Sequence, residues 1–329
     1  MTAPHTSAVL EVPDPVAGPG QVVVEVARAG VCGTDVEFFT GEMEYLRQGL
    51  AAYPLRLGHE WCGTVTAIGP SVVPSWQGAF VTGDTMLGCG VCARCTSGRQ
   101  HVCATRAEVG ILSWPGALAD RLLVPASSLY LLPSTVDTAT GALVEPGGNA
   151  LRCVRAAALS PGDRLLVLGP GTIGLLVALI ALAEGAEVHV VGRSRSSLEF
   201  ASGLGVHGAW TWDTLPPLPF DAVVDASTAP DLPSRAVDLV EPGKRVVYIG
   251  LSGTPSRLDT RTLALKDVTA VGILSASPGL AGIIDLYASG TVDPRPLVAA
   301  TVTLDDVGDV LAGNRPASVS TGPKIHVAM

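Results

Sequence analysis

Charged residues are scarce in this chain of 329 residues, at 16% against 47% hydrophobic residues. Such a composition can fill a large core and argues against disorder. Lysine and arginine, 21 in all, are outnumbered by 30 acidic residues and form no block. A nucleic-acid-binding protein usually carries a basic face, so binding to nucleic acid is not expected.

Long apolar runs are also missing. The longest, residues 173–183, falls short of the roughly 20 residues that a membrane span needs. The first twelve residues contain neither the basic nor the apolar region of a signal peptide. These absences predict a cytoplasmic protein with no membrane partner, and the length suits two domains.

The chain changes character along its length. Its first 150 residues are rich in glycine, proline and valine and predict a small β-rich domain, with strands at 21–28 and 63–68. Beyond residue 159, predicted strands (165–168, 188–191, 222–225, 245–249, 269–273) alternate with helices, including 172–184 and 196–203. Such alternation predicts an α/β fold with a doubly wound parallel sheet. A helix at 280–289 and later strand-like pieces are expected to return to the first domain, which gives segments 1–148, 149–279 and 280–329.

Four of the seven cysteines crowd together as C-x2-C-x2-C-x7-C, at Cys89, Cys92, Cys95 and Cys103. An odd count in a reducing compartment argues against disulfides. Four thiolates at this spacing suit a closed tetrahedral zinc site, whereas a ferredoxin run would end in x3 and a proline. The alternative is a set of buried free cysteines. The spacing predicts a structural zinc with no open position for chemistry.

A second metal site is predicted around Cys32 and His59. A catalytic zinc needs three protein ligands and one open position. Cys32 and His59 supply two ligands, and the third is Glu60 or Glu145; the sequence leaves both open. A lone histidine is more often a core residue, and Glu145 could simply be a charge at the start of a helix. Asp35 is suited to orient His59.

A glycine-rich loop lies between a predicted strand and a predicted helix. Gly169, Gly171 and Gly174 form G-x-G-x-x-G, with Thr172 and Ile173 between the last two glycines. The glycines allow a tight turn and a close approach to a pyrophosphate, which the helix N-terminus then attracts. This context predicts a dinucleotide-binding site.

The residues after the second strand of this unit indicate which dinucleotide binds. An NAD enzyme usually has an acid there for the ribose 2′-hydroxyl, but this chain has Arg193, Ser194 and Arg195. Guanidinium groups can bind a 2′-phosphate with two hydrogen bonds. NADP is therefore favoured and NAD remains possible; the alternative is that the arginines are ordinary surface charges.

Together these motifs resemble the zinc-containing branch of the medium-chain dehydrogenase/reductase superfamily, with the polyol and glucose dehydrogenases as the nearest group. The resemblance rests on residues 30–35, 58–60 and 243–247, the cysteine loop, Glu145-Pro146 and the glycine loop, and it covers nearly the whole chain. It implies a GroES-like catalytic domain, a Rossmann domain, and an active site between them. It also implies two zinc ions per chain, with Cys32 and His59 as ligands and Glu60 and Glu145 as ligands or water-holding neighbours. We expect a homodimer or homotetramer.

Three features depart from the family pattern. Glu37 stands where many polyol enzymes have histidine, so it is a candidate for the proton path, after Thr34, from the substrate hydroxyl. The opening strand of about a dozen residues is missing. Residues 146–149 read Pro-Gly-Gly-Asn and not the usual Pro-Leu-Ala, which predicts an altered floor of the nicotinamide pocket.

The expected activity is oxidation of a secondary alcohol of a sugar, polyol or cyclitol, or reduction of the ketone. Zinc polarises the substrate oxygen and the nicotinamide exchanges the hydride. Side chains that could bind or surround the substrate are Glu37, Glu42, Glu44, Tyr45, Trp61 and Trp114. Alternatives are a zinc-independent quinone or enoyl reductase and a non-enzymatic nucleotide-binding protein.

Overall fold

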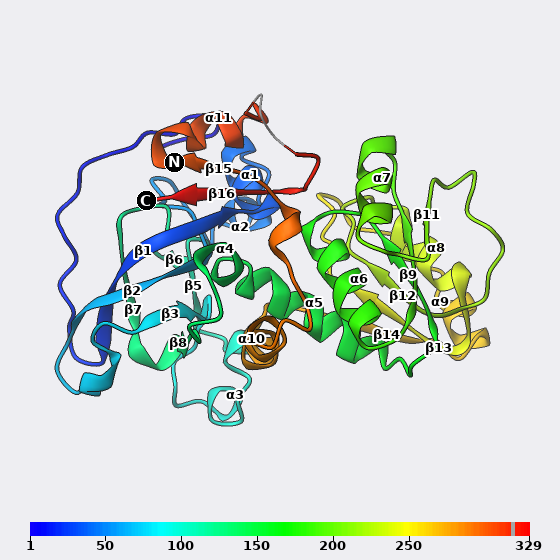
Figure 1. The fold of residues 1–329 in the computed structure, drawn as a ribbon, viewed down its shortest axis with the longest axis horizontal. Helices are drawn as coiled ribbons and strands as arrows, with labels where there is room; N and C mark the ends of the chain where they lie inside the picture. Colours follow the sequence, from blue (N-terminus) through cyan, green and yellow to red (C-terminus); the bar gives the residue numbers. More distant parts are fainter. Residues whose placement is uncertain (317–319) are drawn as a thin grey trace.

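The computed structural model describes residues 1–316 and 320–329 and shows two domains, with helix α5 (Val144–Ala157) at their junction (Figure 1). Blue and cyan strands build the first domain and green and yellow segments the second. Among the described residues, no helix combines the length and the apolar composition that a membrane span requires.

The first domain is built on a seven-stranded sheet in the order β15-β16-β1-β2-β3-β8, with β7 also paired to β1. Its valines at 22, 24 and 26 pack with Trp61 and Val65 in one core. The strands of this sheet are β1 (Gln21–Val31), β2 (Glu60–Ile68), β3 (Phe80–Gly83), β7 (Arg121–Pro125), β8 (Leu129–Leu131), β15 (Val298–Thr303) and β16 (Lys324–Ala328). A three-stranded sheet contains β4 (Met86–Leu87), β5 (Ala107–Val109) and β6 (Ser113–Trp114).

The second domain is a six-stranded parallel sheet in the order β11-β10-β9-β12-β13-β14, which confirms the doubly wound sheet. Leu165 and Val167 of β9 face one core while Leu166 and Leu168 face the other, as strand alternation requires. The strands are β9 (Arg164–Leu168), β10 (Glu187–Val191), β11 (Gly208–Trp210), β12 (Phe220–Asp225), β13 (Val240–Tyr248) and β14 (Thr269–Gly272).

Helices cover both faces of this sheet. Residues of α5, α6 (Thr172–Ala183) and α10 (Leu280–Ala288) share the first core, and α8 (Leu232–Leu239) supplies Leu232, Ala236 and Val237 to the second. The remaining helices are α1 (Gly33–Thr40), α2 (Glu44–Arg47), α3 (Ala93–Thr96), α4 (Thr138–Gly141), α7 (Arg195–Gly203), α9 (Thr260–Leu265) and α11 (Val307–Leu311).

Several predicted strands are longer in the structure, and two of them extend because of pairing that the local sequence does not contain. β1 continues to Val31 because residues 28–31 pair with β16, almost three hundred positions further along the chain. β13 begins at Val240, where it pairs with Phe220, and its register then shifts around Gly243, whose φ is +75°. Strand β11 was not predicted at all.

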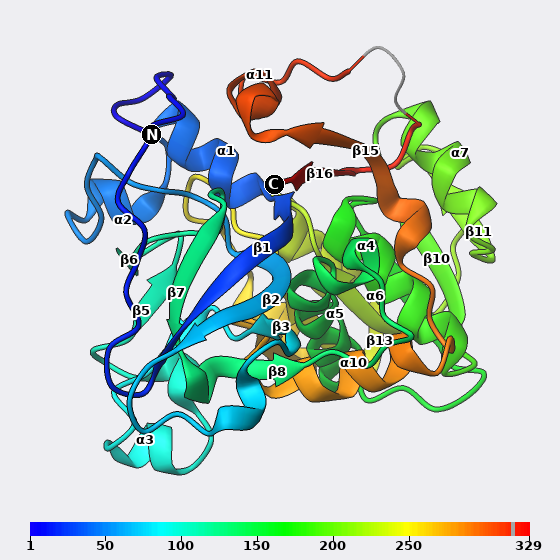
Figure 2. The same ribbon diagram turned by 60° about the vertical axis from the view of Figure 1, so that its left-hand side comes forward.

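The last strands return to the first domain. β16 runs antiparallel to β1 and parallel to β15, so it lies between these two strands; β15 and β16 lie next to each other in Figure 2. The predicted boundary between residues 148 and 149 falls inside α5, so this one helix belongs to both sides of the junction.

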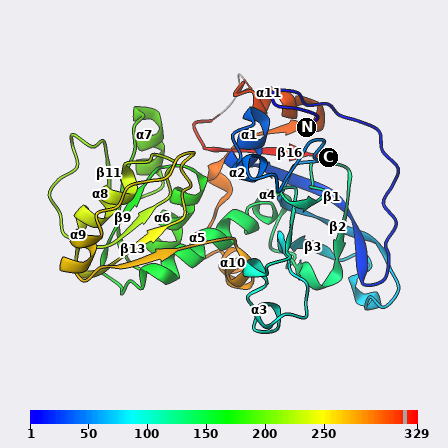
Figure 3. The same ribbon diagram turned by 180° about the vertical axis from the view of Figure 1, so that it is seen from behind.

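The Pro-Gly-Gly-Asn stretch has a packing role that sequence reasoning missed. It lies in the first turns of α5, which pack against α10, as Figure 3 shows from behind. A Cβ atom on Gly147 would lie 2.2 Å from the hydroxyl oxygen of Tyr287, and one on Gly148 would lie 2.9 Å from the Cβ of Ala276. The two glycines therefore allow the close approach of the neighbouring segments, and an altered floor of the nicotinamide pocket stays a prediction.

Candidate active site and metal centres

Three potential metal ligands converge where β1 and β2 meet. Cys32 follows the end of β1 and forms the N-cap of α1, His59 precedes β2, and Glu60 is the first residue of β2. One ligand atom from each side chain lies within 4.8 Å of the others. Gly30 makes room for this arrangement, because a Cβ there would lie 2.1 Å from Glu60 Oε2.

Asp35 ties the ligand-bearing segments together. Its buried carboxylate accepts hydrogen bonds from the backbone N–H of Cys32 (2.8 Å) and of Gly58 (3.2 Å). Its Oδ1 also lies 3.6 Å from His59 Nδ1, which leaves the other ring nitrogen for a metal. Burial acts to lower the pKa of His59, but Asp35, Cys32 and Glu145 outweigh it and hold the pKa well above its usual value. The pocket therefore favours a positive charge at this position.

Glu60 has a partner that sequence reasoning missed. The ammonium group of Lys324, in β16, donates to both carboxylate oxygens of Glu60, at 2.8 and 2.6 Å, and to the carbonyl oxygen of Val31 at 2.9 Å. Both side chains are almost fully buried. One signal in the sequence pointed to Lys324: a lysine and a histidine alternate with apolar residues in β16, where inward-facing positions are normally apolar.

Glu145 lies in the first turn of α5 and is held by its neighbour on the helix. The side-chain amide of Asn149 donates to Glu145 Oε1 at 2.8 Å. Burial raises the pKa of Glu145 to about 7, and the nearby Glu60 adds to the rise. Among the described residues, Glu145 is not one of the three whose ligand atoms cluster, so the geometry brings Glu60 closer to Cys32 and His59 than Glu145.

This donor set fits zinc. Sulfur, imidazole nitrogen and carboxylate oxygen are the ligand types of catalytic zinc sites, and three protein ligands leave a position open. Thr34 and Glu37 follow in α1. They are three residues apart and therefore lie on the same side of the helix. Burial raises the pKa of Glu37, with a further contribution from Glu42.

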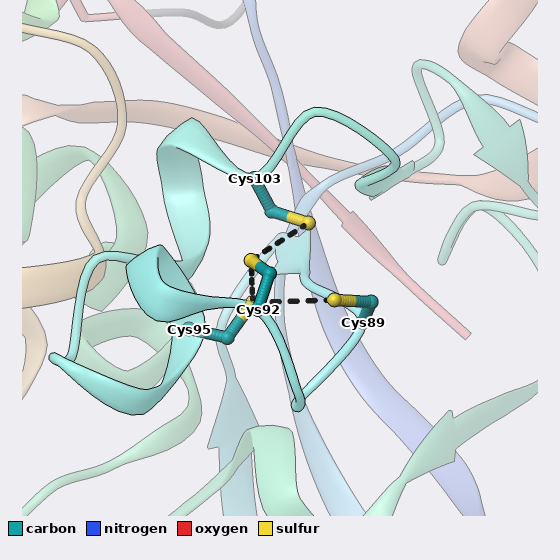
Figure 4. Close-up of side chains that lie close together, drawn as sticks. All are labelled: Cys89, Cys92, Cys95 and Cys103. Carbon is teal, nitrogen blue, oxygen red and sulfur yellow. Dashed lines mark hydrogen bonds between the residues drawn. The ribbon is translucent and has the colours of Figure 1, made fainter.

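The four-cysteine loop brings its thiols together (Figure 4). The sulfur–sulfur distances are 3.9 Å for Cys89–Cys95, 3.6 Å for Cys92–Cys95 and 3.8 Å for Cys92–Cys103. A tetrahedron with Zn–S bonds of about 2.3 Å has S–S edges of about 3.8 Å. The residues present therefore fit a four-thiolate zinc site.

The glycine loop joins β9 to α6 as expected for a dinucleotide site. Gly169 has φ +99°, which only glycine adopts freely, and a Cβ on Gly174 would lie 2.0 Å from the Gly169 carbonyl oxygen. Gly171 is the N-cap of α6, so Thr172 and Ile173 lie in its first turn. The backbone N–H groups at this helix start can receive a pyrophosphate.

The residues after β10 differ in whether their side chains already have a partner within the protein. Ser194 caps α7 by accepting a hydrogen bond from the N–H of Ser197 at 3.2 Å. Arg195 is 92% exposed and pairs with Glu199 at 2.7 Å. Arg193 is exposed at the end of β10. Of the two arginines, Arg193 is therefore the better placed to meet a ribose phosphate.

The structure excludes one suggested substrate contact and shows other partners for two more. Trp61 is 1% exposed and belongs to the first-domain core. The indole N–H of Trp114 donates to the carbonyl oxygen of Leu123 at 2.8 Å. The hydroxyl of Tyr45 donates to Glu108 and accepts from Arg106, both at 3.1 Å. Trp61 packs into the core of the first domain, and the polar atoms of Trp114 and Tyr45 bind other residues of that domain.

Two family models match the chain. The alcohol dehydrogenase GroES-like domain matches residues 18–134, and the zinc-binding dehydrogenase domain matches residues 172–289. A 2-dehydro-3-deoxy-L-galactonate 5-dehydrogenase of Pseudoalteromonas atlantica is 31% identical over 303 residues, 89% of this chain and 87% of the relative. An L-threonine 3-dehydrogenase of Saccharopolyspora erythraea is 32% identical over 276 residues, 80% and 79% of the two chains.

Solved structures agree with these matches. An alcohol dehydrogenase of Escherichia coli complexed with NADH superposes with a TM-score of 0.91 at 25% identity, over 100% of this chain and 97% of the other. A zinc-binding dehydrogenase of Sinorhizobium meliloti bound to NADP gives a TM-score of 0.86 at 26% identity, over 97% and 94%.

The chain therefore belongs to the zinc-containing medium-chain dehydrogenase/reductase superfamily, in its polyol dehydrogenase-like branch, and it is an alcohol oxidoreductase. The predicted GroES-like and Rossmann folds are confirmed. Zinc and a nicotinamide cofactor are the cofactors of this family of enzymes.

Proposed function

We propose that this enzyme oxidises a secondary alcohol of a sugar, polyol or cyclitol with NADP, or reduces the corresponding ketone. The observation that carries the proposal is the cluster of Cys32, His59 and Glu60 ligand atoms within 4.8 Å of one another. The names of relatives support the substrate class, since they include a galactonate dehydrogenase and a sorbitol dehydrogenase. A zinc-independent reductase would need neither these residues nor the cysteine loop.

Cys32, His59 and Glu60 would hold the catalytic zinc, with Asp35 fixing the first two. Zinc bound there supplies polarisation of the substrate oxygen, and the nicotinamide supplies the hydride acceptor or donor. We assign Glu60 as the third ligand because its carboxylate lies in the cluster. Glu145 lies outside the cluster, and its carboxylate accepts a hydrogen bond from Asn149. We therefore assign Glu145 to holding water or substrate.

Thr34 and Glu37 would carry the proton that an alcohol loses on oxidation. The hydroxyl of Thr34 can accept a hydrogen bond from the substrate and donate one onward, and Glu37 lies one turn further along α1. Burial raises the pKa of the Glu37 carboxyl, which brings its proton affinity closer to neutral pH. Glu37 would thus replace the histidine of many polyol enzymes.

The cofactor loop would hold the dinucleotide through Gly169, Gly171 and Gly174, with Thr172 and Ile173 presenting backbone N–H groups. Arg193 would pair with the 2′-phosphate of NADP, because no acid stands at the end of β10 to bind a free ribose hydroxyl.

Metal analysis tests the two zinc sites. We expect about two zinc ions per chain, falling to about one in Cys32→Ser with loss of alcohol oxidation, and to about one in Cys89→Ser. A Cys32→Ser variant that keeps full activity would refute the catalytic assignment. One zinc in the unchanged protein would favour a reductase or a nucleotide-binding protein.

A substrate screen tests the chemical class. Sorbitol, aldonic acids, cyclitols and L-threonine are offered with NADP and then NAD, at equal concentrations. The proposal expects the highest kcat/KM with a polyhydroxylated substrate and NADP. L-Threonine as the best substrate would refute the proposed substrate class and match the threonine dehydrogenase relatives. It would leave the proposed metal site unaffected.

A second copy of the chain would pair along β14. This strand forms an edge of the parallel sheet, and Leu265 and Leu274 beside it are 88% and 39% exposed. We expect a homodimer or homotetramer by light scattering, and a smaller mass for Leu265→Glu. A reducing compartment such as the cytoplasm would keep Cys32 and the four loop cysteines as free thiols that can bind metal.

A further inference from the structure

Asp84 connects three distant segments of the molecule. It lies between β3 and β4, is 3% exposed, and has no regular element of its own. Its Oδ1 accepts hydrogen bonds from the backbone N–H of Met86 (3.0 Å) and from the hydroxyl of Ser277 (2.9 Å). Its Oδ2 accepts one from the side-chain amide of Gln100 at 2.9 Å. Hydrogen bonds to a buried carboxylate are among the strong ones.

The bond to Gln100 leads into the four-cysteine loop. Gln100 begins a 3-10 turn (Gln100–Val102) between Cys95 and Cys103. A Cβ on Gly88 would lie 2.6 Å from the sulfur of Cys95 and 2.8 Å from the Cβ of Gln100. Gln100 and Cys95 therefore both pack against Gly88, so a shift of Cys95 can be passed on to Gln100.

The bond to Ser277 leads to the parallel sheet. Ser277 lies in the segment that leaves β14 and enters α10. The hydroxyls of Ser275 and Ser277 are 3.0 Å apart, and Arg152 of α5 donates to the carbonyl oxygen of Ser275. A Cβ on Gly279 would lie 2.2 Å from the carbonyl oxygen of Gly148. This segment, residues 273–279, thus joins the carboxyl end of β14 to the first turns of α5, where Glu145 lies.

We propose that Asp84 is a positioning residue that couples the metal in the four-cysteine loop to nucleotide binding in the parallel sheet. A metal in the loop would fix Gln100, and Gln100 and Ser277 both donate hydrogen bonds to Asp84. Ser277 in turn fixes segment 273–279 at the carboxyl end of β14. Parallel sheets bind their ligands outside the carboxyl ends of the strands. The proposal rests on the proposed zinc in the loop and on the nicotinamide cofactor. Because coupling is reciprocal, bound nucleotide must also retain the loop zinc.

The test is the release of zinc from the full-length protein to a chromogenic chelator, with and without saturating NADPH, and NADH in a parallel series. The phase that persists in Cys32→Ser belongs to the loop. Affinity differences between related complexes lie mostly in the dissociation rate, so a coupling of about fivefold or more should slow this phase by a similar factor. Ser277→Ala and Gln100→Ala should each abolish the slowing, and the double variant should do no more than either.

Ser289→Ala is the matched control, because that hydroxyl donates to the carbonyl oxygen of Leu286 in its own helix and lies 2.9 Å from the hydroxyl of Thr291; the slowing should remain. Slowing that survives in Ser277→Ala would overturn the role of Asp84, as would an unchanged protein that binds zinc and nucleotide with no slowing. An unchanged protein that binds no loop zinc or no nucleotide would overturn both this inference and the proposed function. A merely structural Ser277 would lower stability equally with and without nucleotide.

Discussion

Lys324 neutralises Glu60 across 264 positions of sequence, with its ammonium nitrogen 2.6 Å from one carboxylate oxygen and 2.8 Å from the other. The pair is almost fully buried beside two potential zinc ligands. Burial acts to lower the pKa of Lys324, but Glu60 and then Cys32 raise it above its usual value. The positive charge of Lys324 therefore compensates the negative charge of Glu60. A metal ion bound by Cys32, His59 and Glu60 would compensate the same carboxylate.

Lys324→Met should destabilise the metal-free protein by about 3–5 kcal/mol, because it leaves the Glu60 carboxylate buried without a partner. The loss should be smaller with zinc bound, since the metal supplies a replacement charge. Chemical denaturation with and without zinc measures both values. Lys244→Met is the control: Lys244 pairs with Asp221 at 2.7 Å but is 41% exposed, and the expected loss is about 1 kcal/mol or less. An equal loss of unfolding free energy in Lys324→Met with and without zinc would show that a bound metal does not replace the charge of Lys324 beside Glu60.

Arg193→Asp should weaken NADPH binding about 10- to 100-fold and leave NADH binding nearly unchanged, because only the former carries the 2′-phosphate. Fluorescence titration of both nucleotides measures the effect. Arg195→Ala serves as the control, since that side chain is 92% exposed and already paired with Glu199. Equal affinity of the unchanged protein for NADPH and NADH would refute the NADP preference.

Gly147→Ala should lower the free energy of unfolding by about 1–3 kcal/mol, because the new methyl group overlaps the hydroxyl of Tyr287. Adding Tyr287→Phe should recover part of the loss by removing the nearest atom. Thermal unfolding of both variants gives the comparison. In Gly203→Ala the added Cβ meets nothing within 4 Å, so that variant should not be destabilised.

His326 should make the protein sensitive to mild acid. It is fully buried in β16, and within residues 1–316 and 320–329 neither ring nitrogen has a hydrogen-bond partner. Burial, followed by Lys324 and Arg28, lowers its pKa to about 3. As the pH falls below about 6.5, His326 is protonated in the unfolded chain but stays neutral in the folded chain. This contribution to stability is therefore complete above about pH 6.5 and is lost progressively down to about pH 3.

The measurement is the free energy of unfolding between pH 7 and pH 4 for the unchanged protein and His326→Leu. The variant should show a shallower fall with acid, by up to about 1.4 kcal/mol per pH unit. His5→Leu, which replaces an exposed histidine, is the control. Parallel curves for the unchanged protein and His326→Leu would show that His326 is not the source.

Features whose residues lie close together in the sequence could be predicted, and features built from distant residues could not. Gly169 to Gly174 and the four cysteines are complete within a few residues, and the structure assembles both as expected. Glu60 is different, because its partner lies in the last strand and no spacing rule connects the two. Asp84 gave no signal for the same reason: Ser277 reaches it from 193 positions away. The assignment of Glu60 over Glu145 that we propose rests on the cluster of ligand atoms in three dimensions, which no spacing in the sequence shows.

The pairing of β16 with β1 sets an order on assembly during synthesis. The nucleotide-binding sheet draws all six strands from one continuous stretch, so it can form as soon as that stretch has left the ribosome. The metal-binding domain must wait, because its sheet has an open edge and Glu60 has no counter-charge until residues 324–328 are made. We therefore expect a nascent chain to form its nucleotide-binding sheet before the site at Cys32, His59 and Glu60 is complete.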